Sequence, residues 1–393
     1  MITKKNTVLI ILAFIVTIIA TDIYLPSFPA MAVFFSCSSD SLQLSVPFYM
    51  IGGLVSPPIF GFAADHFGRK KTLLWGLGIF IFGSFLCFQS LSLTELLIGR
   101  FIQGFGAVSV PIVGWATIQD QYPGQKGAKI MAWVGSIISL GPLVAPSIGG
   151  FIDTIFGWKG NFFLLFIFSL IITTLMVFYF YDVRQISEKK KFHITSILNS
   201  YALIFKNKKF TAYIMLSAFL MCGELCYLTV IPFFLKETFH LTSELIGIYI
   251  SIVSLTYILG TFLASQLVYY VGINKTILLG IMLSLLGASI LLLLSIFQYI
   301  FISLLVIATG LYMIGPALIW GPSTSAALQL FSGQRGSASA VRSLMTQLSM
   351  GVGGLAGSLL NDFDLEPLAI FLVAMCLCSL LFFFQLKTSK HNS

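Results

Sequence analysis

Asp22, Arg100 and Glu224 are ionisable residues that lie inside long apolar runs of this sequence. A charge at the centre of a bilayer costs about 2.5–3.5 kcal/mol on insertion scales, so such residues normally face a cavity or a partner. Burial raises the pKa of a carboxylic acid and a nearby guanidinium lowers it, so an acid subject to both effects can bind and release protons. These residue types therefore predict proton coupling.

The spacing predicts that Asp22 and Arg100 lie at a similar depth. Asp22 follows Lys5 by 17 residues, about 25 Å along a helix, and Arg100 lies about 7 Å deep from the opposite side. The two are expected to form a pair, either one that tunes the acid or a static bridge that serves only packing. Glu224 lies about 21 Å along its own run, and is expected either to line the cavity or to bind a local structural partner.

Composition defines the elements that must position these residues. Charged residues make up 9% of the 393-residue chain and hydrophobic residues 58%, whereas about a quarter of an ordinary soluble domain is charged. Uncharged stretches long enough to cross about 30 Å of hydrocarbon recur from end to end. We predict an all-α integral membrane protein with about twelve spans, at residues 7–33, 42–63, 72–91, 95–118, 128–152, 162–181, 210–234, 244–267, 276–296, 299–327, 337–360 and 367–386.

The basic residues predict the orientation of the chain. If the N-terminus is cytoplasmic, 18 of the 22 Lys and Arg residues fall on the inner side, Lys159 and Lys236 fall outside, and Arg100 and Arg342 lie within spans. This distribution follows the positive-inside rule and places both termini in the cytoplasm. It also accounts for the net charge of +8 without a nucleic-acid partner. Arg342 is expected to extend toward the inner surface.

A cleaved signal peptide is the alternative for the N-terminus, because two lysines, an apolar region and small residues at 30–32 occur in that order. Its apolar region is longer than usual, and cleavage would remove one span and disturb the charge pattern.

The polar segment Asp182–Lys209 divides the chain into two parts with about six spans each. We predict an N-terminal half at residues 1–185, a cytoplasmic basic linker at 186–209 and a C-terminal half at 210–393. Six plus six spans imply an internal duplication. The first span has an acid before two prolines, and the seventh has Glu224 before Pro232, which is weak support for a repeat with binding residues at matching positions.

Three motifs occur in order in the first half. The loop "GFAADHFGRKK" (residues 61–71) contains Gly61, Asp65, Gly68, Arg69 and Lys70, the fourth span contains "RFIQGFGA", and the fifth contains "GPLVAPSIGG". The first resembles the signature loop of the major facilitator superfamily, G-x-x-x-D-x-x-G-R-[KR], and the second resembles its R-x-x-Q-G-x-G-A element. The third, with Gly141, Pro142, Pro146, Gly149 and Gly150, resembles a motif associated with antiporters, although Ala145 replaces its second glycine and close helix packing explains it equally well.

The stretch "TDIYLPSFP", which begins at Thr21, resembles the first span of Bcr/CflA-type drug:proton antiporters. The resemblance covers nearly the whole chain and implies a major facilitator-type fold with about twelve transmembrane helices in two six-helix halves. In that family the first-span acid is associated with proton and substrate coupling. Some relatives have a second acid two turns earlier, where this chain has Phe14, so the proton count per cycle is open.

The resemblance also implies a cytoplasmic latch, which we define as Gly61, Asp65, Gly68, Arg69, Lys70 and Asp120. In the superfamily the loop Asp meets the N-terminal end of the eleventh span, and the loop Arg pairs with an acid at the end of the fourth. Asp120 is that acid here, and Gln119 stands where relatives often have an arginine.

We expect a proton-coupled exporter of small amphiphilic compounds in the inner membrane, acting as a monomer by alternating access. A carrier for one dedicated metabolite, such as a siderophore-like molecule, is the alternative within transport, and an intramembrane enzyme using Asp22 is a third interpretation. Tyr24 and Tyr49 could line an adaptable cavity, although aromatic residues also pack against lipid. No cofactor or metal is expected, because the sequence has no ATP-binding or hydrolase motif and its six cysteines lack metal-ligand spacing.

Overall fold

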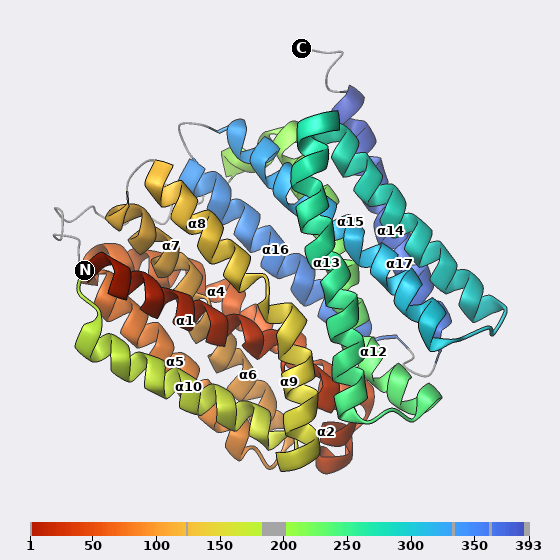
Figure 1. Cartoon of the computed structure of the whole chain (residues 1–393), viewed down its shortest axis with the longest axis horizontal. Helices are drawn as coiled ribbons and strands as arrows, with labels where there is room; N and C mark the ends of the chain where they lie inside the picture. The colour runs from red at the N-terminus through yellow and green to blue at the C-terminus, as the bar shows by residue number, and fades with distance from the viewer. Residues whose placement is uncertain (1, 123–124, 183–201, 332–334, 361–363, 389–393) are drawn as a thin grey trace. The chain divides into compact units, whose positions relative to one another are not determined.

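The computed structural model describes residues 2–122, 125–182, 202–331, 335–360 and 364–388. Within these ranges the regular structure is helical and no strand occurs (Figure 1). Eleven helical segments of the described chain are long and apolar enough to cross a membrane, and each coincides with a predicted span. The remaining predicted span, 337–360, coincides with α16 (Arg335–Gly357), a less apolar helix rich in Ser and Gly residues. The all-α membrane fold is confirmed.

Two compact units make up the chain. The first comprises Met1–Phe192 and Leu241–Ser251. Its helices are α1 (Ile2–Asp22), η1 (Leu25–Ser27), α2 (Phe28–Phe35), α3 (Ser39–Gln43), α4 (Ser45–Phe67), α5 (Arg69–Gln89), α6 (Leu93–Ala107), α7 (Ser109–Gln121), α8 (Gln125–Ile138), α9 (Gly141–Phe156) and α10 (Lys159–Tyr179). Helix α6 packs between α4 and α5, and α1 packs against α7, α8, α9 and α10.

The second unit comprises His193–His240 and Ile252–Ser393. It contains α12 (Lys208–Phe239), most of α13 (Ser243–Val271), α14 (Ile273–Ile296), α15 (Ile302–Gln329), α16 and α17 (Leu365–Thr388). Helix α12 packs against α15, α16 and α17, and α14 packs against α15 and α17. Residues 186–201 of the predicted linker lie outside the described part of the chain.

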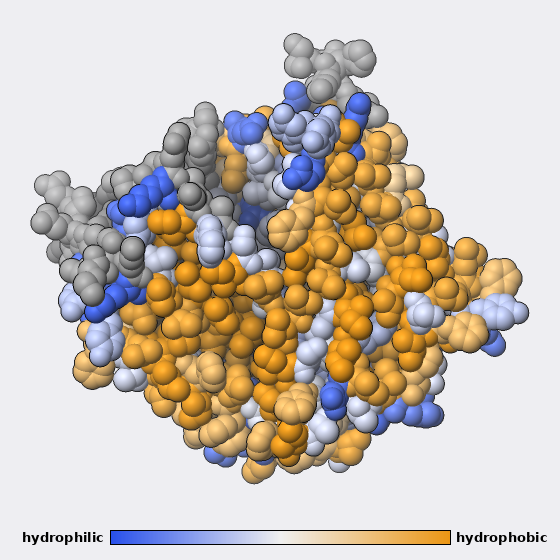
Figure 2. Space-filling view, viewed as in Figure 1, coloured by the Kyte–Doolittle hydropathy of each residue, from blue (hydrophilic) through white to orange (hydrophobic). Residues whose placement is uncertain are grey.

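Large apolar side chains are exposed on helices of both units, among them Phe178 at 69% and Phe262 at 69%. Hydrophobic residues dominate the visible face of α1, α8, α9 and α10, as Figure 2 shows. Soluble monomers rarely expose contiguous apolar area on this scale. The chain is therefore a multi-pass membrane protein.

The first span is interrupted immediately after Asp22. Helix α1 ends at Asp22, and the short η1 turn and α2 complete the span to Phe35. The interruption follows from Pro26 and Pro29, because proline has no N–H group that could continue the helical hydrogen bonds to the Asp22 and Leu25 carbonyls. The last carbonyls of α1 therefore have no partner within their own helix.

Candidate functional site

A fully buried arginine lies within the first unit. Arg100 is 0% exposed on α6, and its guanidinium lies 4.3 Å from the centre of the Tyr24 ring and 4.2 Å from that of the Tyr49 ring. A cation over two aromatic faces in a desolvated site gains about 2 kcal/mol or more. The two tyrosines are thus first of all partners of the arginine.

The interruption of the first span supplies a hydrogen-bond acceptor for this arginine. Arg100 Nη1 donates to the Ala20 carbonyl oxygen at 3.1 Å, and Nε donates to the Ser45 carbonyl oxygen at 3.5 Å. Because α1 ends at Asp22, the Ala20 carbonyl belongs to the last turn, where the helix dipole favours a cation. The proline pair and Arg100 therefore act together, although they are far apart in the sequence.

Gln103 is a further member of the site that the sequence reasoning left without a role. Arg100 Nη1 also donates to Gln103 Oε1, and Gln103 Nε2 donates to Ser84 Oγ at 2.8 Å. The signal was present in the fourth-span motif, since residues three apart share one helix face. Arg100 Nη2 is buried and has no hydrogen-bond partner in the described part of the chain.

Asp22 lies next to Arg100 but is not one of its hydrogen-bond partners. Its side chain is 8% exposed, and it interacts electrostatically with Arg100. Among the described residues no ion pair joins the two, so the static bridge, one of the two alternatives from the sequence, is not seen; the Ala20 and Ser45 carbonyls and Gln103 accept the hydrogen bonds of Nε and Nη1. The carboxyl group is therefore buried beside a positive charge without being held by it.

Both tyrosines are fixed by their own hydrogen bonds. The Tyr24 and Ser45 hydroxyl oxygens lie 3.2 Å apart, and the Tyr49 hydroxyl donates to the Thr17 carbonyl oxygen at 3.1 Å. The structure thus brings Asp22, Tyr24, Tyr49 and Arg100 together, and we call these four with Gln103 the Arg100 cluster.

Glu224 belongs to the second unit, on α12, and is partly buried. Tyr257 on α13 interacts electrostatically with both Glu224 and Arg342. The Arg342 guanidinium lies 4.3 Å from the centre of the Trp320 ring, so it packs on an aromatic face within its unit. Only the tertiary contact between α15 and α16 determines this orientation.

The turn between α4 and α5 carries the loop motif. Arg69 Nε and Asp120 Oδ2 form an ion pair at 3.1 Å. Gly68 has φ of +90° and its ideal Cβ would lie 2.5 Å from Asp182 Oδ2, so both backbone geometry and space favour glycine. Gly61 has open space at its Cβ position, and the side chain of Asp65 lies outside the described part of the chain.

Asp182 is a second acid at this turn that the sequence reasoning treated only as the start of the polar segment at residues 182–209. Its Oδ2 accepts a hydrogen bond from the Lys70 backbone nitrogen at 3.2 Å, which places a carboxylate at the N-terminus of α5. Lys70 Nζ donates to the Val177 carbonyl oxygen at 2.8 Å. A carboxylate at this end of a helix satisfies a free N–H group and interacts favourably with the dipole.

We expect Arg69→Ala to slow transport while leaving the protein folded. The Arg69 side chain is buried but Asp120 is partly exposed, so solvent screens the pair and its loss should lower the unfolding midpoint in detergent only moderately. If the pair holds the cytoplasmic side closed, its loss should increase the labelling rate of cysteines introduced on that side. Arg69→Lys is the matched control, because it keeps the charge. Wild-type transport together with wild-type labelling of the alanine variant would mean that the pair has no gating role.

The antiporter-like motif lies on α9, which begins at Gly141 with Pro142 in its first turn and contains Pro146. A Cβ on Gly149 would overlap the Ile23 carbonyl oxygen, and one on Gly150 would overlap the Ser243 carbonyl oxygen. Gly149 thus allows α9 to approach the interrupted region of the first span directly after Asp22. The motif is a close-packing surface beside the Arg100 cluster.

Comparison with known proteins supports a transporter. The chloramphenicol resistance protein CraA of Acinetobacter baumannii is 25% identical over 336 residues, which cover 84% of this chain and 80% of the relative. A bicyclomycin resistance protein homolog of Haemophilus influenzae is 24% identical over 359 residues, covering 91% and 89%. The crystal structure of a D-xylose-proton symporter matches the fold with a TM-score of 0.76 at 17% identity, covering 97% of this chain and 98% of that one.

The sequence model of the Major Facilitator Superfamily matches residues 10–316 and 214–393. The match includes the loop, fourth-span and fifth-span motifs, and the resemblance seen in the sequence is confirmed. The relatives of this chain are transporters and not enzymes, in line with the transporter predicted from the sequence. The chain belongs to the major facilitator superfamily of membrane transporters.

Proposed function

We propose that the protein is a proton-coupled exporter of small amphiphilic compounds that works by alternating access. The observation that carries this proposal is the buried Asp22 carboxyl beside an arginine whose hydrogen bonds are largely taken by other groups. The names of the drug-resistance relatives support the substrate class.

The geometry suits a carboxyl group that changes protonation state. Burial favours the neutral acid, and the nearby guanidinium favours the charged form. Because Arg100 is held by backbone carbonyls, Gln103 and two rings, it keeps its place when Asp22 is neutral. Protonation of Asp22 therefore does not require the cluster to rearrange. A change of water access to Asp22 during the transport cycle would then bind or release one proton.

Asp22 also provides the negative charge that a cationic amphiphile needs. A substrate cation and a proton cannot both neutralise one carboxylate, so occupancy by one displaces the other. This competition is the simplest basis for exchanging substrate for protons. We propose Glu224 as a second acidic residue of the transport pathway.

We further propose that the protein acts as a monomer in the inner membrane with both termini in the cytoplasm. The 18 to 2 distribution of basic residues motivates this orientation. Reporter fusions after Lys209 and after the C-terminal residue should both report a cytoplasmic location. A periplasmic signal from either fusion would contradict the orientation and favour a cleaved N-terminal segment.

The function is tested with a deletion strain and a panel of dyes, antibiotics and native metabolites. An amphiphile exporter predicts sensitivity to several unrelated amphiphiles, restored by the wild-type gene. Inverted membrane vesicles with an acidic interior should then accumulate the same compounds. A single nutritional or secretion defect without drug sensitivity would instead favour a carrier for one metabolite.

A further inference from the structure

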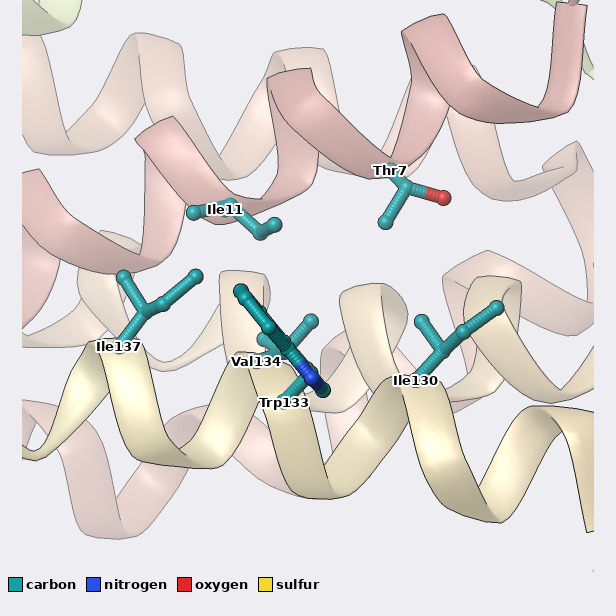
Figure 3. A pocket seen from close by; sticks show the side chains of 6 residues that line it. All are labelled: Thr7, Ile11, Ile130, Trp133, Val134 and Ile137. Carbon is teal, nitrogen blue, oxygen red and sulfur yellow. The ribbon is translucent and has the colours of Figure 1, made fainter.

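A pocket of about 270 Å³ lies between α1 and α8 in the first unit, away from the Arg100 cluster. It is lined by Thr7, Ile11, Ile130, Trp133, Val134 and Ile137. Figure 3 shows Thr7 opposite Ile130 and Ile11 opposite Ile137, so the two helices run side by side in the same direction. Trp133 is 67% exposed, whereas Val134 behind it is 1% exposed. The pocket therefore opens at the surface of the unit.

The lining is unlike that of a site for a drug-sized compound. Such sites usually measure about 300–1,000 Å³ and carry a few polar groups that orient the ligand. Here the polar groups of the lining are the Thr7 hydroxyl, which donates to the Tyr122 hydroxyl at 3.4 Å, and the indole N–H of the exposed Trp133. A narrow space lined mainly by isoleucine and valine side chains suits a hydrocarbon chain.

One end of the pocket is basic. Lys126 lies one helical turn before Ile130 on the same face of α8, because residues four apart are neighbours on a helix. Its Nζ is 5.5 Å from the centre of the Tyr122 ring, and Tyr122 contacts Thr7 at the pocket wall. Lys126 is exposed and lies in the first turn of α8, where the helix dipole also favours an anion.

The distance along α8 from Lys126 to the far end of the pocket matches the depth of one bilayer leaflet. From Lys126 to Ile137 is 11 residues, about 16 Å along a helix, and half of the hydrocarbon core is about 15 Å. A positive charge at headgroup level followed by a leaflet-deep apolar channel is complementary to an anionic lipid. We propose that the pocket binds one acyl chain of an anionic phospholipid from the surrounding bilayer, with Lys126 beside the lipid phosphate.

Trp133 makes the proposal measurable by fluorescence quenching. In full-length protein with Trp75, Trp115, Trp158 and Trp320 replaced by phenylalanine, Trp133 alone would report on acyl chains carrying bromine. In phosphatidylcholine vesicles, brominated phosphatidylglycerol should reach half-maximal quenching at an about fivefold lower mole fraction than brominated phosphatidylcholine, because one lysine near the membrane surface favours an anionic lipid to that extent.

Two variants separate the pocket from general lipid contact. Lys126→Gln should abolish the preference for phosphatidylglycerol, and Ile130→Phe should weaken quenching by filling the pocket. Lys275→Gln is the matched control, because Lys275 is also exposed but lies on α14 of the second unit, and it should leave the preference unchanged. Equal quenching by both lipids, or a preference that survives Lys126→Gln, would overturn the proposal.

A second measurement guards against misfolding of the multiply substituted chain. Native mass spectrometry of the protein with its five tryptophans should show more retained phosphatidylglycerol than phosphatidylcholine, and Lys126→Gln should lose this excess. Equal retention of both lipids by the wild-type protein, or an excess of phosphatidylglycerol that survives Lys126→Gln, would contradict the proposal.

Discussion

Asp22→Asn should abolish proton-driven transport while preserving the fold. Asparagine has the size of aspartate and resembles its neutral form, so the buried site gains no new charge, but the side chain cannot release a proton. Exchange of one proton per uncharged substrate across a gradient of one pH unit sustains about a tenfold accumulation. The variant should reduce this accumulation in inverted vesicles to the level without a gradient.

The control for this variant is Asp40→Asn, which removes an acid that is exposed in the first turn of α3. It should transport like the wild type. Binding of an uncharged substrate to the Asp22 variant should persist better than binding of a cation, since only the cation needs the carboxylate. Full pH-driven accumulation by well-folded Asp22→Asn protein would remove Asp22 from the mechanism.

Arg100→Gln should have the largest effect on stability of any substitution in the Arg100 cluster. The Ala20 and Ser45 carbonyls and Gln103 would lose a donor, and the Tyr24 and Tyr49 rings would lose the cation between them. Removing one partner of a buried charged network typically costs on the order of 3–5 kcal/mol. We expect a clearly lower melting temperature in detergent, together with loss of transport.

Arg342→Gln is the matched comparison, because Arg342 packs on one ring, Trp320, and is less buried. It should lower the melting temperature less than Arg100→Gln does. Arg100→Lys should fall between wild type and Arg100→Gln, since lysine keeps the charge but not the planar contact with two rings. If Arg100→Gln melts like the wild type and still fails to transport, the contacts of Arg100 do not stabilise the fold and Arg100 acts in the transport cycle alone.

Asp22 and Arg100 could be singled out from the sequence because an acid and an arginine in apolar runs are costly. Their relation could not be predicted. Depth along two helices placed both near one level, but which atoms pair depends on what else reaches the guanidinium. The Ala20 carbonyl, Gln103 and two tyrosine rings reach it in the folded protein, so Arg100 contacts these groups and the Asp22 carboxyl lies beside it without a direct ion pair.

The sequence by itself determined the helical membrane fold, the approximate ends of the spans and the family. These depend on local properties, namely the length of apolar runs, the positions of proline and glycine, and short motifs. Only the tertiary structure decided that Asp182 caps α5, that Arg342 packs on Trp320 and that α1 and α8 leave a pocket. Each of these depends on contacts between helices distant in sequence, and such contacts are set by packing and hydrogen-bond saturation in three dimensions, which no periodicity of a single segment encodes.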